Sequence, residues 1–238
     1  ASDITLPMTV GHTAGTLTSG KLMGVRADLV LLTFDETVDG ELSGDADGTD
    51  AFVLALLDGT DVAAEITPTG VSMGGLVTPF DAEVVDPLGT TDDGWLVGVL
   101  ADEASMGADL NDPALFSAGW RPGQCAAGAD GDQTDDVLHY IYFGHSSFAS
   151  TPVNTGLVGR NRVLVVGGTY VATISPETVA GCDLNQDGGT GDLIPRWCEA
   201  IDPATGSMGI LPPVATSIMD AIVASPAGGS FGLVKLED

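Results

Sequence analysis

An internal repeat constrains this chain more than any other feature of its sequence. Three apolar, strand-like runs each end in a glutamate, and a glycine follows four residues after each of Glu36, Glu103 and Glu177. Roughly 70 residues separate successive copies, the length of one supersecondary unit in a repeat protein. An acidic loop, a second strand-like run and a Thr-Gly pair follow in the same order each time, so we expect three copies of one β-rich unit.

The predicted units cover residues 27–78, 92–160 and 163–211, with a partial fourth unit at 214–238. The second unit carries an insertion at residues 112–128. In the first unit, the first run is 29–36, the second run is 52–57 and the Thr-Gly turn is 69–70. In the second unit the same three elements are 95–103, 137–143 and 155–156. In the third unit they are 170–177, 193–201 and 205–206. Pro195 weakens the second run of the third unit, because proline cannot donate to a sheet.

The composition favours an all-β fold. The chain has 33 Gly and 13 Pro, and Asp outnumbers Glu, as in proteins with many short strands and tight turns. Each unit has the strand content of a propeller blade, so we expect one domain with a small β-propeller-like arrangement. Residues 4–10 would close it by pairing into the last unit; a β-sandwich or a linear β-array is the alternative. Helical spacing is found only at residues 214–224, where it overlaps a predicted strand.

The charge excludes several kinds of partner. Seven Lys and Arg face 34 Asp and Glu, which gives a formal charge of −27. A phosphate backbone needs a basic face, so nucleic acid is not expected as a partner, and anionic lipid is disfavoured for the same reason. No apolar run reaches the roughly 20 residues that a membrane helix needs. We therefore expect a soluble, acidic protein that does not insert into membranes.

The acidic loop of the third unit has the residue types of a calcium loop. Asp183, Asn185 and Asp187 alternate with other residues and precede Gly188, so oxygen ligands could surround one ion. An EF-hand would carry a carboxylate at the twelfth position, which is Ile194 here. Asp192 is therefore the better closing ligand, in a loop flanked by strands.

Similar loops are expected in the other two units. Several carboxylates in one short loop repel each other unless a cation neutralises them, although Asp-Gly-rich loops can also be solvated β-turns. The three repeated glutamates could add ligands or cap turns. The candidate ligands are Asp45, Asp47 and Asp50 in the first unit, and Asp109, Asn111, Asp130, Asp132 and Asp135 in the second, where the loop rejoins across the insertion.

Two segments carry a resemblance to a known family: Asp183-Leu184-Asn185-Gln186-Asp187-Gly188 and Asp136-Val137-Leu138-His139-Tyr140. The chain resembles bacterial secreted repeat proteins whose units read strand, acidic Glu, Asp-Leu-Asn-Gly-Asp-Gly-Asp, Val-Leu-His-x-Tyr-Asp and a Thr-Gly turn. It is more loosely similar to the calcium-looped propeller repeats of integrin-like proteins. The resemblance covers residues 27–211 and implies a secreted or cell-surface location. The insertion, the degenerate first loop and Pro195 depart from it.

The cysteines favour one disulfide. Cys182 and Cys198 lie on either side of the third acidic loop, and a bridge closing such a loop would stabilise the fold by about 3 kcal/mol. Two buried free thiols are the alternative. Cys125 is left over, with no His or second Cys at metal-ligand spacing from it.

One motif points to an enzyme. Gly70-Val71-Ser72-Met73-Gly74 matches the nucleophile elbow of α/β-hydrolases. That motif needs a helix after the serine, but Pro79 follows here, and Thr205-Gly206-Ser207-Met208-Gly209 has a similar composition in the third unit. We therefore expect a structural turn and no enzyme. His139 is expected to be a packed strand residue.

The sequence thus predicts an extracytoplasmic, calcium-stabilised β-repeat protein with a structural or adhesive role at a cell surface, where its partner is another protein or copies of itself. The cofactor would be Ca²⁺. The first alternative is a subunit of a self-assembling fibre or surface layer, in which residues 3–10 add a strand to a neighbour. The second alternative is a hydrolase that uses Ser72.

Overall fold

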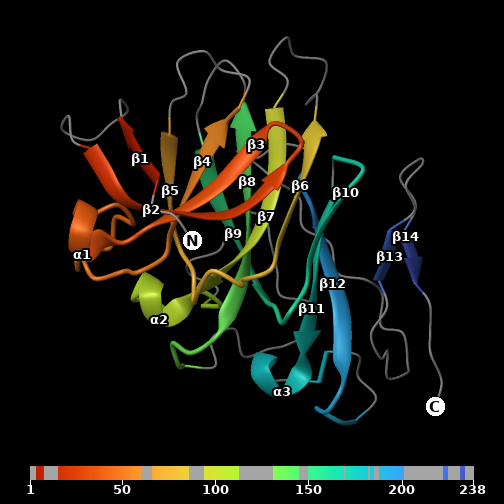
Figure 1. Ribbon diagram of the computed structural model, residues 1–238. Coiled ribbons are helices and arrows are strands. Elements are labelled where there is room, and N and C mark those ends of the chain that lie inside the picture. Colours follow the sequence, from red (N-terminus) through yellow and green to blue (C-terminus); the bar gives the residue numbers. More distant parts are fainter. Residues whose placement is uncertain are drawn as a thin grey trace.

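Nearly all regular structure in the computed structural model is β (Figure 1). The structure describes residues 4–7, 16–59, 66–85, 94–112, 131–144, 150–168, 170–181, 183–184, 188–200, 222–224 and 231–233. Within these ranges the strands form three antiparallel sheets and one separate pair, and no closed barrel is present. The predicted all-β class is therefore confirmed, whereas the propeller-like arrangement stays a prediction.

Sheet 1 has the order β1-β2-β3-β4-β5, sheet 2 the order β6-β7-β8-β9, and sheet 3 the order β10-β11-β12, while β13 pairs with β14. Each sheet is a meander, so consecutive strands are neighbours. The strands of sheet 1, from β1 to β5, are Ile4–Pro7, Thr16–Arg26, Leu29–Phe34, Val53–Asp58 and Ile66–Ser72. Those of sheet 2, from β6 to β9, are Phe80–Val85, Gly94–Asp102, Asp136–Gly144 and Ser150–Val158. Those of sheet 3, from β10 to β12, are Val163–Val166, Tyr170–Pro176 and Leu193–Glu199, and the separate pair is β13 (Ile222–Ala224) with β14 (Phe231–Leu233).

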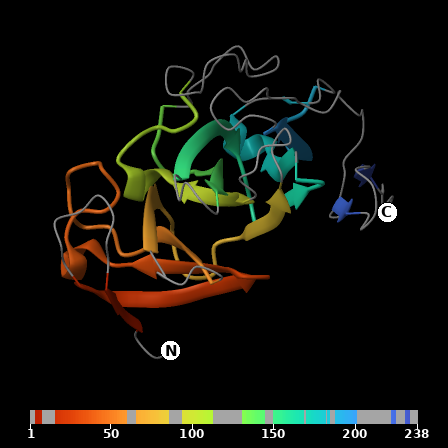
Figure 2. The ribbon, with the colours of Figure 1, turned by 90° about the horizontal axis from the view of Figure 1, so that it is seen from above.

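The sheets are stacked on one another through apolar side chains. One cluster joins sheet 1 to sheet 2 and includes Leu31, Leu56 and Val97. A second cluster joins the opposite side of sheet 2 to sheet 3 and includes Leu138 and Val165. Sheet 2 is therefore the middle layer, and Figure 2 shows it between the other two. Because both of its faces are covered, every described side chain of β7 up to Ala101 is buried.

A glycine allows the close approach of sheets 2 and 3. A Cβ atom added to Gly98 in β7 would lie 2.7 Å from Val163 Cγ1 and 2.8 Å from Val171 Cγ1. Both distances are shorter than real Cβ contacts, so a larger residue would force the sheets apart.

Both described Thr-Gly pairs lie inside a strand, which differs from the turn that the sequence predicts. The register of β5 shifts against β4, the register of β9 shifts against β8, and Gly70 and Gly156 have φ angles of 75° and 64°. Each threonine hydroxyl donates to a carbonyl of the neighbouring strand, Thr69 to Leu54 at 2.9 Å and Thr155 to Leu138 at 2.6 Å. These pairs are thus β-bulges, which need a residue that tolerates positive φ. The third pair, at 205–206, lies outside the described residues.

Two further predictions about elements are corrected. β1 pairs with β2 and so belongs to the first sheet, not the last. β12 continues through Pro195, which lies opposite Ile174 on the last described strand of sheet 3, where a missing N–H can face away from the sheet. Sheet 1 includes two strands that precede the first predicted unit, β1 and β2, and sheet 2 includes one strand that precedes the second predicted unit, β6. Of residues 214–224, the described part is the strand β13.

No helix in the described part of the chain is long and apolar enough to cross a membrane.

Candidate functional site

The three repeated glutamates occupy equivalent places, which is the basis of the candidate site. Each begins a one-turn helix directly after the second or third strand of its sheet: α1 (Glu36–Asp39), α2 (Glu103–Met106) and α3 (Glu177–Ala180). The glycine four residues later ends each turn, and its N–H donates back to the glutamate carbonyl. Figure 1 shows the three turns on a diagonal line from α1 at the left, through α2, to α3 near the bottom. The sequence did not predict these helical turns, since four residues are too few for a helical pattern.

All three glutamate side chains are buried, at 2 % exposure or less. Their carboxylates accept hydrogen bonds from backbone N–H groups of the acidic loop. Glu36 Oε1 accepts from Leu42 at 2.6 Å and from Ser43 at 2.5 Å. Glu103 Oε1 accepts from Leu110 at 2.7 Å and from Asn111 at 3.2 Å. Glu177 Oε1 accepts from Leu184 at 2.7 Å.

The second carboxylate oxygen binds the far end of the same loop. It accepts from the N–H of Asp50 at 3.2 Å, of Asp135 at 3.1 Å and of Asp192 at 3.1 Å. The glutamate N–H donates in return to the carbonyls of these aspartates, at 2.8, 3.0 and 2.9 Å. Each glutamate thus fixes both ends of its acidic loop, and a buried carboxylate with several donors meets the requirement that buried charge be hydrogen-bonded.

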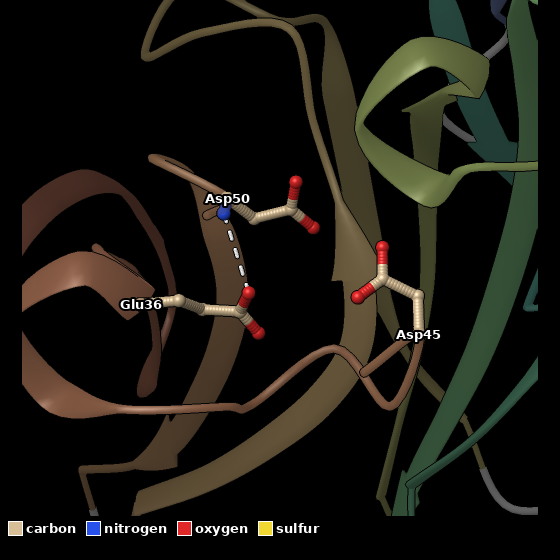
Figure 3. Close-up of side chains that lie close together, drawn as sticks. All are labelled: Glu36, Asp45 and Asp50. Atoms are coloured by element: carbon tan, nitrogen blue, oxygen red, sulfur yellow. Dashed lines mark hydrogen bonds between the residues drawn. The ribbon is translucent and has the colours of Figure 1, made fainter. Parts of the chain in front are cut away.

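In the first loop, three carboxylates converge. Glu36, Asp45 and Asp50 each offer one oxygen, and these oxygens lie within 4.8 Å of one another. Figure 3 shows the three side chains pointing toward a common space, with the bond from Asp50 N to Glu36. The Ser72 hydroxyl donates to Asp50 Oδ2 from the end of β5, so the third strand of the unit also contributes.

The main electrostatic effect in this cluster is a raised pKa of Asp50. Burial raises the pKa of Asp50 to about 6, and the neighbouring carboxylates of Asp45, Glu36 and Asp47 raise it further, while the Ser72 hydroxyl opposes them. A carboxyl whose pKa is raised by burial and like charge favours either a proton or a cation beside it.

The second loop repeats the arrangement with different residues. Oxygens of Glu103, Asp132 and Asp135 lie within 4.8 Å of one another. Asn111 Nδ2 donates to Asp135 Oδ2 at 3.1 Å, so the two sides of the insertion do rejoin as the sequence predicts. Burial raises the pKa of Glu103, against the lowering effect of the hydrogen bonds from Asp135, Asn111 and Leu110.

The third loop is described in part. Glu177 holds Leu184 and Asp192 as its counterparts do, and Asp183 Oδ2 accepts from the N–H of Gly188 at 2.8 Å. Asn185 and Asp187 lie outside the described residues, as do Asp130 in the second loop and the side chains of Cys182, Cys198 and Cys125. The predicted ligand set of this loop and the disulfide therefore stay predictions.

The remaining predicted ligands have other surroundings. Asp47 is exposed, does not join the first cluster, and accepts from the N–H of Thr49 at 2.8 Å. Asp109 begins the second loop but also lies outside its cluster.

Sequence reasoning missed Glu41. It precedes Leu42-Ser43 as Asp109 precedes Leu110-Asn111 and as Asp183 precedes Leu184, and its carboxylate accepts from the N–H groups of Gly44 and Gly48 at 2.6 and 3.0 Å. These and further hydrogen bonds lower the pKa of Glu41. Aligning the leucines of the three loops would have found it.

Two other candidates of the sequence are buried. Ser72 is fully buried and hydrogen-bonded to Asp50, and residues 74–77 after it form a bend and a turn where a nucleophile elbow would have a helix. His139 lies in β8 with Nδ1 3.1 Å from the carbonyl oxygen of Val137, and its burial lowers its pKa to about 4. The prediction of a packed strand histidine is consistent with this position.

The comparisons with known proteins add no relative: no protein-family model, no curated protein and no solved structure matches the chain.

Proposed function

We propose that this chain is a calcium-binding β-repeat protein with a structural or adhesive role outside the cytoplasm. The observation that carries the proposal is the recurrence of one carboxylate cluster in two successive units, Glu36 with Asp45 and Asp50, and Glu103 with Asp132 and Asp135. An acidic group on a surface is common by itself, but two groups at equivalent loop positions, each built around a buried glutamate, indicate a common purpose.

The chemistry of the donors suits calcium. Ca²⁺ takes six to eight oxygen ligands and accepts irregular geometry. Three carboxylates would supply part of each shell, and loop carbonyls and water would supply the rest. Because the glutamates already fix the loop ends, the aspartates would need little rearrangement to bind, which lowers the cost of ordering the site.

The surface role rests on the resemblance and on the charge. The resemblance to secreted repeat proteins and the strong negative charge favour an extracytoplasmic protein whose partner is another protein or a second copy of itself. Assembly by strand addition keeps one supporting observation, because β1 is an outer strand of sheet 1. The hydrolase alternative is not proposed, since the hydroxyl of Ser72 is buried and donates to Asp50.

The test is thermal unfolding of the full chain in millimolar calcium and in EGTA, at matched ionic strength and with a magnesium control. An ion at about 100 times its dissociation constant stabilises by about 2.7 kcal/mol per site. A calcium-specific rise in Tm of several degrees is expected. Equal Tm values in calcium, magnesium and EGTA would contradict the proposal.

Three variants locate the sites. Asp45→Ala and Asp132→Ala should each reduce the calcium-dependent rise, because each removes one converging carboxylate. Asp47→Ala is the matched control, since Asp47 caps Thr49 as Asp132 caps Thr134 but lies outside the clusters. An equal loss in all three variants would indicate nonspecific charge screening.

A further inference from the structure

The stacking of the sheets has a direction. In sheet 1 we call the side with Leu29, Leu31 and Leu56 the front face, and the side with Leu32 and Phe34 the back face. The front face packs on sheet 2, and the back face belongs to a separate apolar cluster.

Sheet 2 repeats this orientation. Leu96 lies as many residues before Glu103 as Leu29 lies before Glu36, so the two leucines are equivalent. Leu96 belongs to the cluster shared with sheet 3, whereas Trp95 and Val97 on the opposite side pack on sheet 1. The front faces of sheets 1 and 2 thus each pack on the back face of the next sheet in the sequence.

The N-terminal end of the stack is covered. β2 pairs with β3 through residues 21–26, and its first half pairs with β1. Leu17 of this first half joins the back-face cluster of sheet 1 and is 2 % exposed. Asp39 of α1 holds this segment, accepting from the N–H groups of Thr18 and Ser19 at 2.7 and 3.1 Å. A covered end face is what a repeat array needs at its terminus.

At the other end, the front face of sheet 3 carries Ala172, Ile174 and Trp197. Val171 lies in the cluster with sheet 2, so its neighbours in β11 point to the opposite side. Ala172 lies opposite Trp197 in the sheet. Ala172 and Ile174 are only 3 % and 6 % exposed, yet neither belongs to an apolar cluster formed by the described residues.

We infer that the front face of sheet 3 is a docking face for one further layer of the same design, and that residues 201–238 of this chain provide that layer. Two observations carry the inference. The equivalent faces of sheets 1 and 2 both pack on the segment that comes next in the sequence, and residues 201–238 come next here. This segment also contains the antiparallel pair β13–β14, so it supplies two paired strands to such a layer.

The inference is independent of calcium, because it concerns the stacking faces and not the loops. It assigns an interaction surface to the C-terminal end of the stack and commits to an occupant within the same chain.

Hydrogen exchange of the full chain, read by mass spectrometry, tests it. Ala172→Arg puts a charged side chain on the front face, and Val84→Arg is the matched control, because Val84 is 58 % exposed on β6. We expect peptides from 201–238 to be protected in the wild type and in Val84→Arg. They should exchange at least tenfold faster in Ala172→Arg, while peptides from β3 and β7 keep their protection.

Ile174→Ala serves as a milder second variant if Ala172→Arg also exposes β3 and β7, and it should accelerate exchange in the same peptides. Two results would overturn the inference. The first is exchange of 201–238 in the wild type at the rate of an unstructured peptide. The second is protection of that segment that rises with protein concentration alongside a dimer in size-exclusion chromatography, which would make a second copy the occupant.

Discussion

Glu103 and Asp135 are joined by two hydrogen bonds that run in opposite directions. The N–H of Asp135 donates to Glu103 Oε2 at 3.1 Å, and the N–H of Glu103 donates to the Asp135 carbonyl at 3.0 Å. The pair closes a loop from which Leu110 and Asn111 also donate to the same carboxylate. The buried glutamate is therefore a structural centre of its unit, whether or not an ion is bound.

Glu103→Gln tests this role. Glutamine has one acceptor oxygen in place of two, and its amide group would face N–H donors, so buried donors would be left unsatisfied. We expect a loss of about 1–3 kcal/mol in the free energy of unfolding, measured by urea denaturation in EGTA. Asp28→Asn, which makes the same charge change at an exposed turn, should lie within about 0.5 kcal/mol of wild type. Equal midpoints for all three proteins would contradict the role.

Gly98→Ala tests the packing of sheets 2 and 3. The added Cβ would meet Val163 and Val171 at less than 3.0 Å, so one sheet must shift. We expect a loss of about 1–3 kcal/mol, the usual cost of overpacking a core. Gly75→Ala is the matched control, because a Cβ at that position meets no atom within 4 Å. If both alanine variants unfold at the same urea concentration, the close approach of the sheets is wrong.

Asp50 should make the calcium-free protein less stable as the pH rises. Its folded pKa of about 6 lies above the usual aspartate value of 3.8, so the folded chain keeps a proton that the unfolded chain has released. Stability therefore falls between pH 3.8 and about 6. Asp50→Asn lacks this fall, while its amide oxygen can still accept from Ser72. Urea midpoints of both proteins across this range, in EGTA, measure the difference; parallel curves would contradict the assignment.

His139 should stay neutral in mildly acidic solution. Its burial lowers the pKa to about 4, so its C–H resonances should not titrate between pH 7 and 5. By linkage, its contribution to stability is present above pH 6.5 and is lost as the pH falls toward 4. An NMR titration in a His12→Gln, His145→Gln background isolates the signal. A midpoint near 6.5 would show that the ring is exposed to water.

The sequence predicted the positions of the strands better than it predicted the bulges within them or the order in which the sheets stack. Apolar runs such as 29–34 and 170–176 became strands, because their residue types suit a sheet that is buried on both faces. The bulges at Gly70 and Gly156 and the strand through Pro195 were not predicted, since each depends on which neighbouring strand pairs at that point. The order of stacking also follows from tertiary contacts, which no local pattern encodes.

The candidate site was predicted in part. The sequence identified Asp45, Asp50, Asp132 and Asp135, which converge in the structure, because carboxylate spacing is visible in a linear pattern. It also singled out the repeated glutamates but could not assign them to the loop backbone. That role depends on burial, and the residue type alone does not tell whether a glutamate is buried or exposed.

Two hydrogen bonds join each glutamate to the aspartate that ends its loop, so the strands on either side are held together almost independently of the length of the loop. The joined residues are separated by 14, 32 and 15 positions in the three units. Doubling the length of a flexible loop costs only about 0.6 kcal/mol in closure entropy, so the longer second loop is inexpensive to carry. The same tolerance makes the tip of each loop a natural place to graft a foreign peptide without disturbing the strands that frame it.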